Sequence, residues 1–185
     1  MMGRTHLVLG INTLWLLEVE PLASLVARDP MRFPLCLGAA ALGALLPDLD
    51  AGQSLLSNLS LGGVRPLLLP ARAISRTLGH RGVLHSLTAL GVLGVVSLPI
   101  VRFEELAWLA LLLGYLSHLL GDACTKRGIP LFHVPLLRPR RSPVHLLPQA
   151  LRLTTGSLAE EAVFVLLASA ALTLLLRHLL AFTLP

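Results

Sequence analysis

The sequence contains little charge. Only 14% of its 185 residues are Asp, Glu, Lys or Arg, whereas a soluble globular domain usually carries about 25%. Aromatic residues make up 4%, and none of the basic stretches is interleaved with them. Although the net charge is +5, the sequence therefore lacks the aromatic and basic platform of a nucleic-acid-binding surface. We expect no nucleic-acid partner and attribute the excess positive charge to membrane topology.

Cysteine is also scarce. Cys36 and Cys124 are the two cysteines in the chain, and they form neither a CxxC motif nor another metal-ligand spacing. We expect both to be reduced and to act as small apolar packing residues.

Apolar residues dominate the sequence. They account for 55% of the chain, and the mean hydropathy is +0.78. This composition predicts an all-α integral membrane bundle that forms a single domain over residues 1–185. The predicted helices are 5–19, 33–46, 83–101, 104–124 and 158–180. The first two are shorter than the ~20 apolar residues of a full span, so the sequence leaves open whether they cross the bilayer. The stretch "LGAAALGALL" favours close packing between helices.

The basic residues predict the orientation. With five spans, the N-terminus and two long loops, about 50–82 and 126–157, lie on the same side of the membrane. That side carries Arg4, Arg65, Arg72, Arg76, Arg81, Lys126, Arg127, Arg138, Arg140, Arg141 and Arg152. Because basic loops stay in the cytoplasm, we expect the N-terminus and both long loops to lie inside the cell.

The same topology collects the unusual polar residues on the cytoplasmic side. Four separate stretches reach this face, and their ligand-type residues are His6, Asp48, Asp50, His80, His85, His118 and Asp122. His118 and Asp122 are four residues apart and should project from one helix face. Asp48 and Asp50 follow a helix-ending proline, where a loop can turn both carboxylates toward one ion. We expect His80 at the cap of the third helix and His85 about one turn inside it.

These residue types indicate a metal-dependent hydrolase. Imidazole together with carboxylate suits zinc, manganese or iron, and six or seven ligands could hold two ions. Such ions activate a water molecule for attack on a phosphoester, here of a membrane lipid or a lipid-linked substrate. Asp50 or Asp122 would orient the water or act as general base, and Arg81 would neutralise phosphate charge.

Other interpretations remain open at this point. A histidine at a membrane edge can be an interfacial anchor, which is how we interpret His133, His145 and His178, and Arg81 can be a simple topology signal. The cluster as a whole could be a hydrogen-bonded structural knot, a non-catalytic metal-binding scaffold or a metal transporter. Transport favours ionisable residues near the bilayer midplane and a path between both faces. Here they gather at one face.

The motifs "THLVLG", "GALLPDLD", "GHRGVLHS" and "GYLSHLLGDACTKRGIPLF" together resemble the YdjM-like family of bacterial and archaeal inner-membrane metal-dependent hydrolases. The match covers about residues 5–135. Leu84 departs from the family pattern, which has threonine there. The resemblance implies a helical, membrane-embedded metallohydrolase with the seven His and Asp residues as its polar signature. A more distant similarity to helical zinc-dependent phospholipases C implies phosphoester cleavage.

Overall fold

The described part of the chain contains five α-helices, and they correspond to the five predicted segments. The computed structural model describes residues 1–18, 29, 31–51, 54–60, 63, 65, 83–130, 132 and 143–183. The helices are α1 (Gly3–Asn12), α3 (Arg32–Leu45), α5 (Leu87–Val96), α6 (Glu105–Ala123) and α7 (Leu158–Thr183). Within these described ranges there are two isolated β-bridges and no β-strand. The predicted all-α class is confirmed.

Three of the helices are followed by 3₁₀ turns. These turns are Thr13–Glu18 after α1, Leu46–Asp50 after α3 and Leu98–Arg102 after α5. Pro47 and Pro99 occupy the first turn of the latter two, where the missing N–H of proline costs no hydrogen bond. The prolines therefore lie where the α-helices end, as the sequence predicts.

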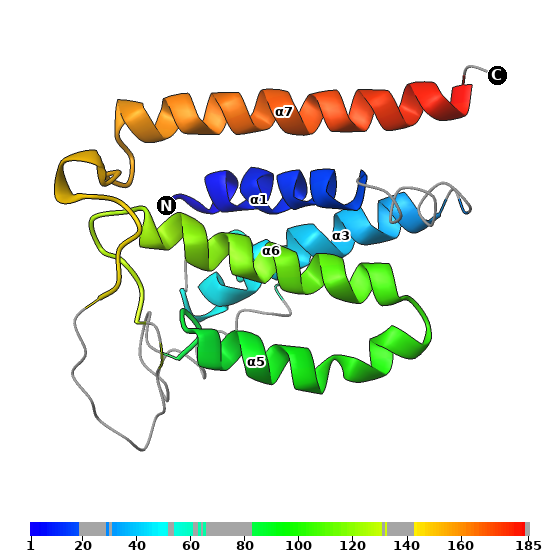
Figure 1. Cartoon of the computed structure of the whole chain (residues 1–185), viewed down its shortest axis with the longest axis horizontal. Helices are drawn as coiled ribbons and strands as arrows, with labels where there is room; N and C mark the ends of the chain where they lie inside the picture. Colours follow the sequence, from blue (N-terminus) through cyan, green and yellow to red (C-terminus); the bar gives the residue numbers. More distant parts are fainter. Residues whose placement is uncertain are drawn as a thin grey trace.

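α6 lies at the centre of the bundle, with α3 and α1 packed beside it, α5 on the opposite side and α7 beyond α1 (Figure 1). The most extensive interface joins α3 and α6. There a Cβ on Gly43 would lie 2.0 Å from the Leu111 carbonyl oxygen, and one on Gly114 would lie 2.2 Å from that of Ala40. Because only glycine permits such an approach, the two backbones touch. The predicted close packing is confirmed.

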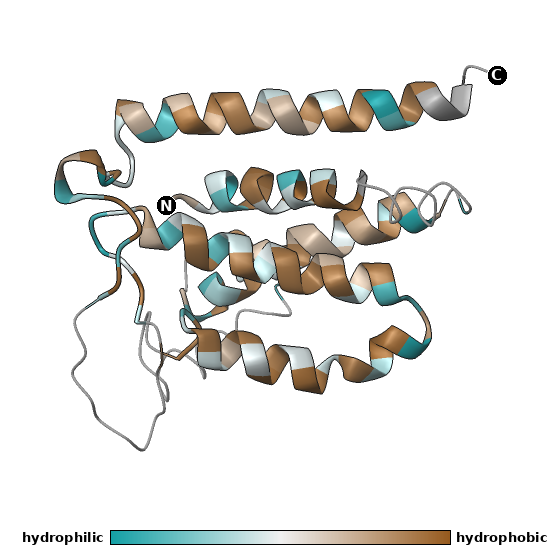
Figure 2. Cartoon of the chain, in the orientation of Figure 1, coloured by the Kyte–Doolittle hydropathy of each residue, from teal (hydrophilic) through white to brown (hydrophobic). Residues whose placement is uncertain are grey.

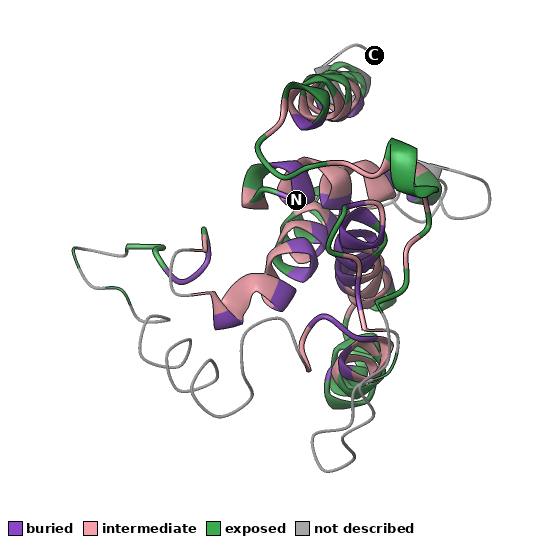
Figure 3. Cartoon of the chain, turned by 90° about the vertical axis from the view of Figure 1, so that its left-hand side faces the viewer, coloured by how far each residue is buried: buried purple, intermediate pink, exposed green. Residues whose placement is uncertain are grey.

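The outermost helix, α7, is held mainly by α1. Asn12 donates from Nδ2 to the Leu167 carbonyl oxygen at 2.8 Å, and Leu174 is buried in the same apolar cluster as Leu14 and Phe33. Most of the other described side chains on α7 remain partly or fully exposed, in contrast to those of α6 (Figure 3). The exposed surface is apolar along most of the helix (Figure 2), which suits contact with hydrocarbon.

Three helices are long and apolar enough to cross a membrane, judged over the described ranges. They are Arg32–Asp50, Glu105–Ala123 and Leu158–Leu180. The first consists of α3 together with its 3₁₀ extension, so the second predicted segment reaches 19 residues. α5 is apolar but shorter. These three candidate spans support a membrane location.

Candidate metal centre

Five of the predicted ligand residues meet at one end of the bundle. This end holds the start of α1, the 3₁₀ turn after α3, the start of α5 and the end of α6 (Figure 1). The residues that it brings together, called here the His/Asp cluster, are His6, Asp48, His85, His118 and Asp122. All are buried except Asp48, which is partly exposed. Four elements that are distant in sequence thus build one compact polar site.

The first half of the cluster comprises His6, His118 and Asp122, whose ligand atoms lie within 4.8 Å of one another. His6 Nε2 is 3.2 Å from Asp122 Oδ1. The rings of His6 and His118 stack with their centroids 3.6 Å apart and an interplanar angle of 13°. The four-residue spacing places His118 and Asp122 on the same face of α6, with 3.9 Å between Nε2 and Oδ2.

The second half comprises Asp48, His85 and His118, again with ligand atoms within 4.8 Å. Asp48 Oδ1 lies 3.3 Å from His85 Nε2 and 3.8 Å from His118 Nε2. His85 Nε2 is also 3.8 Å from Asp122 Oδ2, so the two halves adjoin. His118 belongs to both halves.

The α3–α6 interface fixes the orientation of the His118 ring. Its Nδ1 donates to the Ala44 carbonyl oxygen at 2.7 Å, because a carbonyl can only accept. In a neutral imidazole the proton is then on Nδ1, and Nε2 presents a lone pair. Nε2 is buried and makes no hydrogen bond to any described residue. Metal-ligating histidines commonly show this arrangement.

His85 lies in a turn before α5, and this corrects the expectation that it sits about one turn inside the helix. α5 begins at Leu87 with Ser86 as its N-cap, whose Oγ accepts from the Ala89 N–H at 3.3 Å. A serine side chain satisfies the free N–H groups of a first turn, so the helix starts there. The Tyr115 hydroxyl on α6 donates to the Leu84 carbonyl oxygen and ties the turn to the bundle.

Asp48 and Asp50 separate in the structure. The 3₁₀ turn has three residues per turn, so residues two apart point in different directions. Asp48 enters the cluster, whereas Asp50 is buried. Asp50 is thus absent from the two ligand groups found among the described residues. The expectation that both carboxylates face one ion is not supported by this geometry.

Several groups contact the carboxylate and the main-chain carbonyl of Asp122. Besides His6, its Oδ1 lies 2.5 Å from the Met1 nitrogen. The buried Thr125 donates to the Asp122 main-chain carbonyl oxygen from both N and Oγ1, at 3.0 and 2.7 Å. These contacts hold the end of α6 and the carboxylate in place.

The remaining sequence candidates have ordinary roles or lie outside the described residues. His80, Arg81 and His133 fall outside them. His178 stacks on Phe33, and His145 Nε2 lies 3.2 Å from the Lys126 carbonyl oxygen. Both are outside the cluster.

The cysteines also stay out of it. Both are free, Cys36 lies in the apolar core, and burial raises the pKa of the Cys124 thiol. Cys36 thus packs as a small apolar residue, as the sequence predicts, whereas Cys124 is partly exposed.

The sequence does not predict two groups that support the cluster. These are the Ala44 carbonyl, which orients His118, and the Tyr115 hydroxyl, which holds the His85 turn. A carbonyl gives no sequence signal. Tyr115 is the only tyrosine in the chain and lies three residues before His118. This spacing indicates that both side chains lie on the same face of a helix.

A helical bundle with candidate membrane spans and a buried His/Asp cluster defines a small membrane protein with a potential metal centre. The sequence matches the YdjM inner membrane protein family over residues 1–183, and the chain belongs to that family. It is 33% identical over 117 residues to the inner membrane protein YdjM of Escherichia coli (strain K12), covering 56% of this chain and 55% of the relative. The chain thus matches about half of that relative's length.

A second relative aligns over a longer range. The uncharacterized protein YvsG of Bacillus subtilis (strain 168) is 30% identical over 163 residues, which cover 88% of this chain and 87% of the relative. No solved structure matches. The resemblance to the YdjM-like family is therefore confirmed, and the similarity to phospholipases C stays a prediction.

Proposed function

We propose that the chain is a multi-pass, metal-dependent hydrolase of the inner membrane. It acts at the cytoplasmic leaflet on a phosphoester of a lipid or of a lipid-linked substrate. The His/Asp cluster holds the metal, and the N-terminus lies in the cytoplasm, as the basic loops predict.

One observation carries the proposal. His85 Nε2 and His118 Nε2 are buried, face the carboxylates of Asp48 and Asp122 at 3.3–3.9 Å, and make no hydrogen bond to any described residue. Buried polar atoms normally find partners, and leaving them without one costs about 1–3 kcal/mol each. A divalent cation would satisfy these lone pairs and both carboxylates at once.

The donor set limits which ion fits. Three imidazoles and two carboxylates suit zinc, manganese or iron better than calcium or magnesium, and we propose zinc. His118 has a single ring nitrogen available, Nε2, and can therefore ligate one ion. Because both halves of the His/Asp cluster share His118, we assign them to one metal position. A second ion would need further ligands, for which Asp50 and His80 are the sequence candidates. When bound, the ion would supply Lewis-acid chemistry and lower the pKa of a water molecule.

The protein residues would divide the remaining tasks. Asp48 is the one partly exposed member of the cluster and marks the side from which a substrate reaches it. Asp122, fixed by the Met1 nitrogen and His6, is placed to orient a water molecule or accept its proton. Asp50 keeps the predicted alternative role of general base, and Arg81 that of neutralising phosphate charge.

Lipid is the favoured substrate because of where the cluster lies. It sits at the ends of two candidate spans, Arg32–Asp50 and Glu105–Ala123, so a headgroup phosphate can reach it without leaving the bilayer surface.

A hydrolysis screen tests the proposal. Purified protein in detergent is incubated with phospholipids and isoprenoid phosphates, and release of the phosphorylated or dephosphorylated product is measured. We expect turnover by the wild type, loss in His118→Ala and after chelation, and retention in His145→Ala, which removes a histidine outside the cluster. Turnover that survives in His118→Ala would contradict the proposal. Full metal loading without hydrolysis of any such substrate would favour the non-catalytic scaffold.

A further inference from the structure

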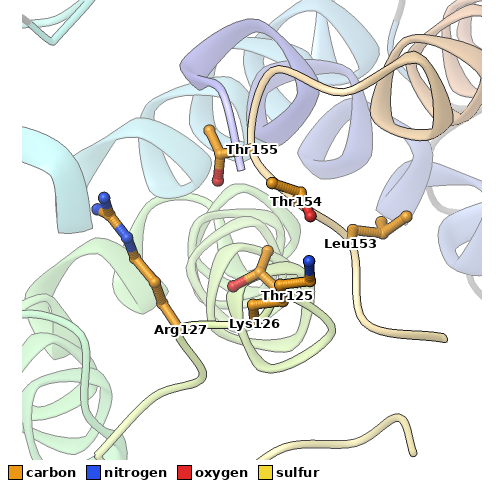
Figure 4. Close-up of a pocket in the computed structure, with 6 residues that line it drawn as sticks. All are labelled: Thr125, Lys126, Arg127, Leu153, Thr154 and Thr155. Carbon is orange, nitrogen blue, oxygen red and sulfur yellow. The ribbon is translucent and has the colours of Figure 1, made fainter. Parts of the chain in front are cut away.

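A second polar site lies outside the His/Asp cluster, where the chain leaves α6 and approaches α7. This cavity, called here the Lys126 pocket, has a volume of about 140 Å³. It is lined by Thr125, Lys126, Arg127, Leu153, Thr154 and Thr155 (Figure 4). Two lining residues are cationic, three carry hydroxyls and none is acidic.

Main-chain hydrogen bonds fix the frame of the pocket. The Lys126 N–H donates to the Leu153 carbonyl oxygen, and the Leu153 N–H donates to that of Cys124, each at 3.0 Å. These bonds pair the two segments as a parallel bridge. On the α7 side, Gly156 has a φ of +80°, and its N–H donates to Glu160 at 2.6 Å. One wall is therefore held by backbone pairing, and the other by a bond from the Gly156 N–H to the Glu160 side chain.

The pocket lies where two candidate spans end. Glu105–Ala123 stops just before Thr125, and Leu158–Leu180 begins just after Thr155. If both helices cross the bilayer, the pocket sits at the depth of the lipid headgroups, where Lys and Arg meet phosphate.

The pocket also adjoins the His/Asp cluster. Thr125 donates from Oγ1 to the Asp122 carbonyl oxygen, so the pocket begins one helical turn beyond a proposed metal ligand. A group held here is a neighbour of the proposed metal centre.

The polar side chains that line the pocket suit an anion. Lys126 and Arg127 are exposed cations, and the exposed Thr154 and Thr155 carry hydroxyls (Figure 4). Ammonium, guanidinium and hydroxyl groups are the usual donors to phosphate oxygens. The Thr125 hydroxyl proton is already used in its bond to Asp122.

The nearby carboxylates have partners of their own. Glu160 accepts from the Met2 and Gly156 N–H groups, each at 2.6 Å, and Glu161 pairs with Arg4. The Lys126 and Arg127 charges therefore have no carboxylate in the pocket lining to neutralise them.

We propose that the Lys126 pocket binds the phosphate of an anionic lipid headgroup and holds that headgroup beside the His/Asp cluster. This inference rests on the proposed function for its biological meaning, because it says where the substrate headgroup would be held. The binding itself can be measured without catalysis.

Native mass spectrometry of the full chain released from detergent measures this binding. The probes are phosphatidic acid and phosphatidylcholine, with inorganic phosphate as competitor. We expect wild type to prefer phosphatidic acid, and Lys126→Gln and Arg127→Gln each to weaken its binding about tenfold, as loss of one charge-assisted hydrogen bond would. Arg102→Gln, which removes an equal exposed charge at the opposite end of the bundle, should leave it unchanged.

A double variant separates a built pocket from general charge attraction. Thr154→Val with Thr155→Val keeps the charge and removes two hydroxyl donors, so we expect weaker phosphatidic acid binding. Wild-type binding by this variant, or equal losses in Arg102→Gln and Lys126→Gln, would overturn the proposal. Displacement of the lipid by inorganic phosphate at equal concentration would overturn the lipid assignment in favour of free phosphate.

Metal content keeps the two proposals apart. The pocket variants should retain the metal of the wild type, whereas Asp48→Asn should lose metal and still bind phosphatidic acid. A wild type without metal that shows the predicted lipid pattern contradicts the proposed function and leaves the pocket standing. A metal-loaded wild type without preference for phosphatidic acid contradicts the pocket proposal and leaves the proposed function standing.

Discussion

The Nδ1 atom of His118 donates a hydrogen bond to the Ala44 carbonyl oxygen, 2.7 Å away across the α3–α6 interface. One turn earlier on α6, Gly114 faces the Ala40 carbonyl so closely that an added Cβ would lie 2.2 Å from it. The orientation of the His118 ring thus depends on backbone contact between two helices, and that contact depends on glycine.

Gly43→Ala should destabilise the protein. The new methyl would lie 2.0 Å from the Leu111 carbonyl oxygen and force α3 from α6, at an overpacking cost of about 2 kcal/mol. Thermal unfolding in detergent measures this loss of stability, and the metal affinity of the same variant should also fall. Gly38→Ala is the control on the same helix, because no atom lies within 4 Å of its added Cβ. That variant should be neutral or stabilised by up to ~1 kcal/mol. Equal melting temperatures for both variants would contradict the packing argument.

Tyr115→Phe should weaken metal binding while the fold remains. The change removes the hydroxyl that holds the Leu84 carbonyl, so the turn carrying His85 is less well fixed, and loss of such supporting contacts typically costs at least about tenfold in metal affinity. Competition with a chromophoric chelator measures the affinity.

Trp108→Phe is the matched control for this prediction. It removes the hydrogen bond from Nε1 to Ser97 Oγ, 3.0 Å long, near the opposite end of α6. If Tyr115→Phe and Trp108→Phe bind metal equally well, Tyr115 has no role in positioning His85.

Glu160→Gln should destabilise the start of α7. The buried carboxylate accepts N–H donors on both oxygens, from Met2 and Gly156, and a glutamine would turn an NH₂ group toward one of them. Loss of a charge-assisted bond and an unsatisfied buried donor cost about 2 kcal/mol, measured by thermal unfolding. Glu161→Gln disrupts only an exposed ion pair with Arg4 and should cost less than ~1 kcal/mol. A larger loss in Glu161→Gln would refute this assignment.

The sequence predicts the helices and the gathering of polar residues well, because both follow from periodicity and topology. Apolar runs predict α6 and α7 nearly to their ends. The up-and-down order then places His6, His85 and His118 at one end, since alternate helix ends share a face. The motifs that resemble the YdjM-like family identify the same residues.

Local geometry is harder to predict. Whether Asp48 and Asp50 point together depends on the choice between a loop and a 3₁₀ turn after Pro47, which the sequence leaves open. The third predicted helix begins before α5 does, because Ser86 caps the helix after His85. The Ala44 carbonyl acts only because α3 and α6 touch, a tertiary property that no local pattern shows.

The most direct test of the central claim is the metal content of the purified full chain. Wild type, His118→Ala and His145→Ala are purified in detergent without added metal, and zinc, manganese and iron are quantified per chain. We predict a stoichiometric ion in wild type and His145→Ala and its loss from His118→Ala, with all three proteins showing the same helical content. A folded wild type without metal, or a His118→Ala variant that retains it, would contradict the account.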